Sequence, residues 1–77
     1  MTEVKSINSQ EIVVAVSGRL TTDTVPAVQK ELFSLIDSHP GILLTLDAEG
    51  IDYITSMGLR MLLKIDKRDD VRFRLLN

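Results

Sequence analysis

Two short apolar runs restrict the folds open to this chain more than any other feature. Residues 12–16 read IVVAV and residues 42–46 read ILLTL. Runs of this length, rich in branched aliphatic side chains, are typical of strands that are buried on both faces. Between them, apolar residues recur at three- and four-residue spacing, which predicts a helix over residues 25–36. The apolar positions of that helix are Val25, Val28, Leu32, Leu35 and Ile36.

The flanking segments complete a strand–helix pattern. Residues 4–9 are weakly patterned and predict an edge strand, residues 57–67 predict a second helix, and residues 71–75 alternate between apolar side chains and arginines. Strands joined through helices favour parallel pairing. We therefore expect an α/β fold in the order β-β-α-β-α-β, with a mixed, mainly parallel four-stranded sheet, as one domain over residues 1–77.

The second helix has its own set of apolar positions. We expect it to bury Leu59, Leu62 and Leu63, with Ile65 as a further candidate. Met57 and Met61 are four residues apart and therefore share one side of the helix. Such a pair is usually core, although an exposed methionine beside Ser56 would suit a binding surface.

Composition excludes several classes of function. The 77 residues include 9 Lys and Arg against 11 Asp and Glu, a net charge of −2, which argues against binding the phosphate backbone of a nucleic acid. The chain has no cysteine, so disulfides and thiolate chemistry are excluded, and a reducing cytoplasm is favoured. The apolar runs are far shorter than the about 20 residues of a membrane-spanning helix, so we expect no membrane insertion.

The sequence also shows no motif that is typical of a catalytic, phosphate-binding or metal-binding site. His39, the single histidine, precedes Pro40 at the predicted end of the first helix, where it suits the helix terminus rather than a catalytic base. The four glycines form no phosphate-binding loop, and Asp47 and Asp52 alone make a weak metal site. We therefore expect no catalysis, no cofactor and no metal.

Polar side chains gather where two predicted strands end. In sheets of this kind, ligands and partners bind at the loops beyond the carboxyl ends of the strands, which here are residues 17–23 and 47–58. Ser56 lies at the start of the second helix, where free N–H groups favour an anion. The plain alternative is that Ser56 is a helix N-cap with no other role. The polar residues of the two loops include Thr21, Thr22, Asp23, Asp47, Asp52, Thr55 and Ser56.

Two motifs resemble those of the STAS family, the sulfate-transporter and anti-sigma-factor-antagonist domain. Residues 46–59 read LDAEGIDYITSMGL, which resembles the family's strand ending in Asp followed by a Ser-x-Gly-Leu that opens a helix. Residues 17–24 read SGRLTTDT and are similar to the family's Gly-x-Leu-Asp-x-x-Thr loop. Their separation and the element order extend the resemblance over nearly all of the chain.

The resemblance implies a partner-binding site with a phosphorylated serine at Ser56. We expect its hydroxyl to be accessible, with Asp47 and residues 21–23 nearby. Thr55 stands where phosphorylated members carry Asp, Thr21 replaces the Asp of the first loop, and Met57 is bulkier than the usual residue. The expected partner-binding residues are Thr21, Thr22, Asp23, Asp47, Thr55, Ser56, Met57, Gly58 and Met61.

The function implied is that of an anti-sigma factor antagonist. Such a module binds an anti-sigma factor of the serine-kinase type, and phosphorylation of Ser56 by that kinase switches the binding in transcription regulation. The alternative is a STAS scaffold subunit that is never phosphorylated, part of a larger complex such as a transporter assembly.

The chain is shorter at its C-terminus than the resemblance leads one to expect. The family's usual C-terminal helix is missing, so we expect apolar surface to remain uncovered. Such a surface could be buried in a homodimer.

Overall fold

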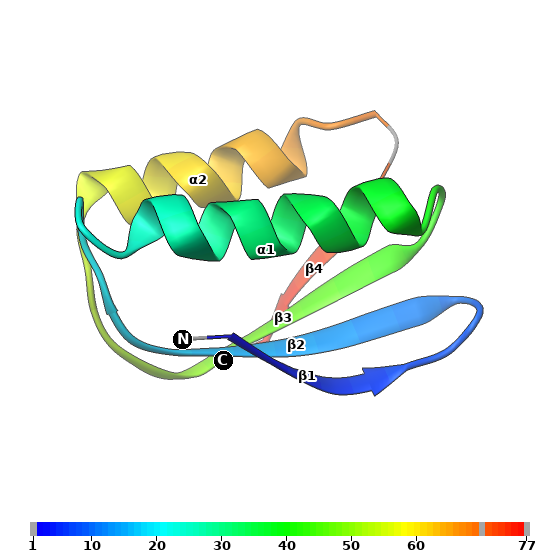
Figure 1. The fold of residues 1–77 in the computed structure, drawn as a ribbon, viewed down its shortest axis with the longest axis horizontal. Coiled ribbons are helices and arrows are strands. Elements are labelled where there is room, and N and C mark those ends of the chain that lie inside the picture. The colour runs from blue at the N-terminus through cyan, green and yellow to red at the C-terminus, as the bar shows by residue number, and fades with distance from the viewer. Residues whose placement is uncertain (1, 70, 77) are drawn as a thin grey trace.

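Both helices lie on one face of a four-stranded sheet (Figure 1). The structure is a computed structural model that describes residues 2–69 and 71–76. The expected single domain, residues 1–77, also includes three positions that lie outside the described residues. The elements are β1 (Thr2–Ile7), β2 (Glu11–Leu20), α1 (Val25–Ser38), β3 (Leu43–Ile54), α2 (Ser56–Asp66) and β4 (Arg72–Leu76).

The sheet has the predicted order and direction. Its strands are arranged β1-β2-β3-β4, with β1 antiparallel to β2 and with β2, β3 and β4 parallel. The hairpin between β1 and β2 brings β1 to one edge, and each crossover helix connects two neighbouring parallel strands. The predicted mixed, mainly parallel α/β sheet is confirmed.

The two central strands are longer than the apolar runs that predicted them. Beyond those runs β2 and β3 stay paired, from Ser17 opposite Gly50 to Leu20 opposite Ile54, with irregular register near Ala15 and Gly18. Gly50 permits the close approach, since a Cβ there would lie 2.9 Å from the Ser17 Cβ. Much of this extension is exposed, so it carries no apolar pattern by which the sequence could reveal it.

The core is the layer between the sheet and the helices. Alternate residues of β2 and β3 face the helices, and α1 buries the predicted stripe, with Leu35 only half-buried. The spacing prediction for α1 is therefore confirmed. The buried apolar residues are Ile12, Val14, Val16, Leu20, Val25, Val28, Leu32, Ile36, Ile42, Leu44, Leu46, Met61, Ile65 and Val71.

α2 presents a different side to the core from the one expected. Leu59 is 53% exposed and Leu63 56% exposed, whereas Gly58, Met61 and Ile65 are buried. The expectation that both leucines are core residues is wrong. Because Gly58 lacks a side chain, it lets the helix approach the ends of β2 and β3, and this approach rotates the leucines outward.

Several large apolar side chains are exposed in the described part of the chain. The exposed large apolar side chains are Val4, Ile7, Tyr53, Leu59, Leu63 and Leu75. They are spread over β1, the end of β3, α2 and β4, and a homodimer formed through any of them stays a prediction. Within residues 2–69 and 71–76, no helix is long and apolar enough to cross a membrane.

We expect Leu32→Ala to lower the free energy of unfolding by about 2–5 kcal/mol, because its fully buried side chain would leave a cavity between α1 and the sheet. Leu63→Ala is the matched control, since it removes the same atoms from an exposed helical position and should cost less than about 1 kcal/mol. Urea unfolding of both variants measures the difference. Equal costs would contradict this assignment of the core.

Candidate functional site

Ser56 is the first residue of α2, and its side chain is exposed. Thr55, not Ser56, occupies the N-cap position, with extended backbone angles (φ −95°, ψ 176°). The Thr55 N–H and hydroxyl both donate to the Leu20 carbonyl, at 2.9 and 3.0 Å. The start of α2 is thereby fixed to the end of β2, and the Ser56 hydroxyl is presented from a defined point on the surface.

The loop before α1 lies beside this point. Thr21 follows Leu20 directly, and Figure 1 shows the N-terminal ends of the two helices at the same end of the molecule. The Thr24 hydroxyl donates to the Arg19 carbonyl at 2.6 Å and accepts from the Thr21 N–H at 2.9 Å, which holds the loop in a compact turn. The structure therefore places Thr21 close to Thr55 and puts the loop before α1 at the same end of the molecule as the start of α2.

Asp47 lies away from Ser56, contrary to expectation. It pairs with Ala15 on one side and Leu76 on the other, and its Oδ1 accepts from the Glu49 N–H at 3.0 Å. From Asp47 the strand continues to Ile54, roughly 20 Å of extended chain. Because β3 does not end at residue 46, Asp47 lies within the strand and not at the loop before α2.

Three other predicted partner-binding residues are covered to different degrees. Gly58 and Met61 are buried, and Met57 is half-buried. Gly58 and Met61 cannot contact a partner from this position; they pack α2 against the sheet. Of the residues expected on α2, Ser56 is exposed and Met57 is partly accessible.

The exposed side of α2 carries residues that the sequence assigned to the core. Leu59 and Leu63 lie three and seven positions after Ser56, so they share its side of the helix. We call the exposed residues Ser56, Leu59, Arg60, Leu63 and Lys67 the outer face of α2. The set at positions 58, 61 and 65 has the same three-and-four spacing, so periodicity alone could not choose which set is buried.

The start of α2 offers a site suited to an anion. The first turn of α2 has no acidic residue, so its free N–H groups and the positive end of the helix dipole face Ser56 without an internal counter-charge. His39 is the C-cap residue of α1, at the end of that helix away from the loop of residues 21–23. Its Nδ1 lies 2.8 Å from the Leu35 carbonyl oxygen. No cluster of metal-ligating side chains occurs in the described part of the chain.

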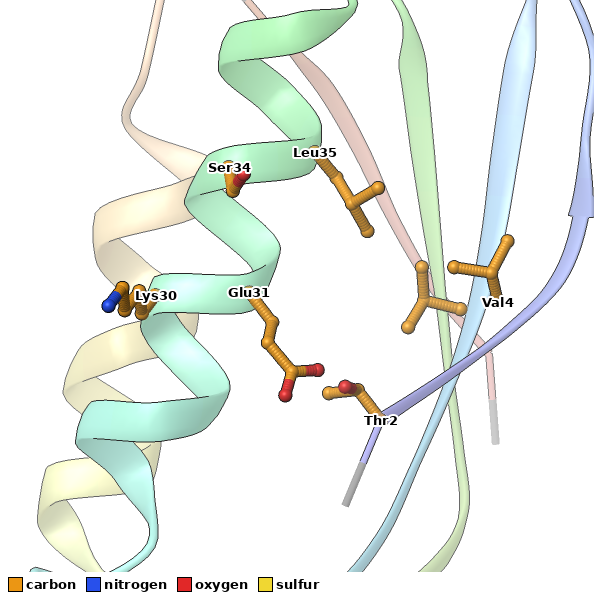
Figure 2. A pocket seen from close by; sticks show the side chains of 7 residues that line it. Thr2, Val4, Lys30, Glu31, Ser34 and Leu35 are labelled. Carbon is orange, nitrogen blue, oxygen red and sulfur yellow. The ribbon is translucent and has the colours of Figure 1, made fainter.

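A groove lies on the other side of α1, between that helix and β1 (Figure 2). Its volume is about 390 Å³, and a second hollow of about 500 Å³ shares Thr2 and Glu31 with it and extends to Asp23. In Figure 2, Leu35 points into the space from the helix and Glu31 points toward Thr2. The titratable lining residues of the first groove are Lys30 and Glu31, which provide no nucleophile paired with a base.

Comparison with known proteins links this arrangement to one family. A family model described as Mlab, STAS domain, matches residues 4–77. The crystal structure of an anti-sigma factor antagonist from Mycobacterium paratuberculosis superposes with a TM-score of 0.81 and 25% identity, covering 97% of this chain and 64% of that one. This chain therefore spans somewhat less than two thirds of that relative. No curated protein matches it.

Two more distant structures share the fold alone. Mglu superposes with a TM-score of 0.78 at 18% identity, covering 97% of this chain and 19% of Mglu. The anti-sigma factor antagonist SpoIIAA, solved in its unphosphorylated form, superposes with a TM-score of 0.64 at 14% identity, covering 83% of this chain and 58% of SpoIIAA.

We expect Gly58→Ala to destabilise the domain by about 1–2 kcal/mol, although alanine is the better helix former by about 1 kcal/mol. The new Cβ would lie 2.7 Å from Ile54 Cγ1 and 3.1 Å from Leu20 Cβ. In an Ile54→Ala background the nearest clash is removed, so the same substitution should cost less. Chemical unfolding of the two single variants and the double variant measures this coupling. An identical cost in both backgrounds would show that Gly58 does not set the approach of α2.

Proposed function

The chain belongs to the STAS domain family, and we propose that it is a regulatory protein-binding module of the anti-sigma factor antagonist type, switched by phosphorylation of Ser56. Its partner on this proposal is an anti-sigma factor with serine kinase activity. The observation that carries the proposal is the exposed Ser56 at the first position of α2, on the same side as Leu59 and Leu63.

The position of Ser56 suits a phosphoryl acceptor. A kinase must reach the hydroxyl oxygen and align it with the phosphoryl donor, and this hydroxyl is exposed at a fixed point of the surface. A phosphate would add about −1.5 to −2 charges at neutral pH. At a helix N-terminus this charge is favourable for the fold, so phosphorylation would leave the domain folded.

The same charge would oppose binding. Ser56 lies one helical turn from Leu59, so a partner that covers the leucines would also have to cover the phosphate. A phosphate in that contact would lose its water without gaining a matched partner, and it would repel acidic groups facing it. The unphosphorylated form would therefore be the binding form.

A scaffold role is the second candidate, favoured by the exposure of Leu59 and Leu63. Apolar side chains that are about half exposed on one helix are suited to a lasting contact in a larger complex, such as a transporter assembly. On this reading the outer face stays covered and Ser56 is never modified. The two candidates use the same surface and differ in whether charge at residue 56 changes the binding.

We expect Ser56→Ala to bind the cognate anti-sigma factor with wild-type affinity and to escape phosphorylation. Ser56→Asp should bind at least about tenfold more weakly, a loss of about 1.4 kcal/mol, because it places a carboxylate in the contact. Isothermal titration calorimetry of both variants, together with phosphopeptide mass spectrometry of the wild-type chain after incubation with the kinase and ATP, makes the test.

Ser9→Asp is the matched control for added charge. Ser9 is exposed in the turn between β1 and β2, at the far end of the strands from Ser56, so its replacement should leave the affinity unchanged. Equal affinities for the Ala and Asp variants at residue 56 would overturn the switch. That result, combined with a complex that persists in the presence of ATP, would support the scaffold.

We also expect Ser56→Asp to raise the free energy of unfolding by about 0.3–1 kcal/mol at neutral pH and low salt, because the carboxylate meets the positive end of α2. The gain should shrink as ionic strength rises. Thermal unfolding at low and high salt measures it, with Ser9→Asp as the control that shows no such gain. A destabilised Ser56→Asp would mean that binding loss in this variant reflects unfolding.

A further inference from the structure

We infer that the outer face of α2 docks an amphipathic helix of the partner whose apolar residues are flanked by acidic ones. This inference rests on the proposed function for the position of the contact, and it adds the chemistry of what binds there. Its basis is an exposed apolar pair and a set of cations that form no ion pair with any of residues 2–69 and 71–76.

The apolar part of the face has the spacing of a helix–helix seam. Ser56, Leu59, Leu63 and Asp66 follow one another at intervals of three, four and three residues, which are the a and d positions of a heptad repeat. Leu59 and Leu63 at its centre are 53% and 56% exposed. Two leucines one turn apart on an exposed seam match the apolar side of a second helix.

The charged part of the face is positive although the chain is negative overall. Arg60 and Lys67 directly follow the two d positions and therefore flank the seam, and Lys64 lies beside them. None of these three forms an ion pair with any residue in the described part of the chain. With a net charge of −2 for the whole chain, this concentration of free cations on one helix is local.

The acidic residues near the face indicate where the partner's acidic groups belong. Asp66 ends the seam, Asp52 is exposed four residues before Ser56, and Asp23 is exposed in the loop before α1. Carboxylates of the partner would be repelled there and attracted along the side that carries Arg60, Lys64 and Lys67. The partner helix is therefore expected to be acidic on the flank that faces these cations.

The same charges argue against a second copy of this chain as the occupant. Two α2 helices packed antiparallel about a twofold axis would bring Arg60 and Lys67 of one copy close to the cations of the other, because e positions face e positions in that arrangement. Like charges at flanking positions oppose such pairing. Complementarity thus favours a different protein with acidic residues.

Phosphorylation would act on this charge pattern directly. Arg60 is four residues after Ser56, the spacing at which an anion and a following cation on a helix attract each other. A phosphate at Ser56 would engage Arg60 and cancel part of the positive charge that attracts the partner.

The test uses the full chain and two labelled, end-capped synthetic peptides of about three heptads, both with Leu at every a and d position. One peptide has Glu at all e and g positions and the other has Lys. Fluorescence anisotropy gives the affinities, and amide chemical shifts of the ¹⁵N-labelled chain locate the contact. We expect the Glu peptide to bind at least about tenfold more tightly than the Lys peptide and to shift the resonances of α2.

Charge reversal on the chain provides the matched comparison. Arg60→Glu combined with Lys67→Glu should reverse the preference, so that the Lys peptide binds more tightly. Lys30→Glu reverses one charge on the other helix, where Lys30 lines the groove between α1 and β1, and it should leave both affinities within about twofold. Leu63→Ser should weaken both peptides, since it removes apolar contact from the seam.

Four outcomes would overturn the inference. They are equal affinity for both peptides, shifts centred on the groove between α1 and β1, a preference unchanged by the double charge reversal, and self-association in sedimentation that Leu63→Ser abolishes. The last would assign the face to a second copy. Failure of the proposed switch can be told apart from failure of the docking inference. If Ser56→Asp still binds the Glu peptide with wild-type affinity, the switch is wrong and the docking inference stands.

Discussion

The junction at Leu20 constrains the rest of the site. Its carbonyl accepts two hydrogen bonds from Thr55, and its side chain, fully buried, lies under Gly58. One residue thus joins the end of β2, the start of α2 and the beginning of the loop before α1. The hydroxyl at position 55 also explains a departure from the STAS pattern, because an ionised Asp there could not donate to a carbonyl.

The rotation of α2 about its axis follows from this junction. With Gly58 against Ile54 and Leu20, the next positions one turn apart that reach the core are Met61 and Ile65. Leu59 and Leu63 are then turned to solvent on the same side as Ser56. A packing constraint at the end of the sheet therefore determines which apolar side chains of α2 are exposed.

Sequence reasoning was accurate where burial leaves a periodic pattern. The strand cores, the α1 stripe and the order of elements each follow from apolar spacing, and the structure confirms them. It failed where the deciding factor is a tertiary contact. The extension of β3 past Asp47 is largely exposed and has no apolar pattern. The sequence therefore predicts a loop at Asp47, whereas the strand ends only at Ile54. The side of α2 that is buried depends on how closely Gly58 approaches its neighbours, which spacing alone does not encode.

A small domain limits where a charge-based switch can sit. A chain of this size buries a modest core, and folded domains are stable by only about 5–15 kcal/mol, so a modification that weakened the fold by a few kcal/mol would remove a large part of that stability. Within a buried seam or at the C-terminal end of a helix, two added negative charges would have that effect. At the first position of α2 they face the positive end of the helix and Arg60 one turn away, while still lying on the face that carries Leu59 and Leu63. On the proposed function, negative charge added at this position would favour the fold and oppose binding, so affinity could change without loss of the folded domain.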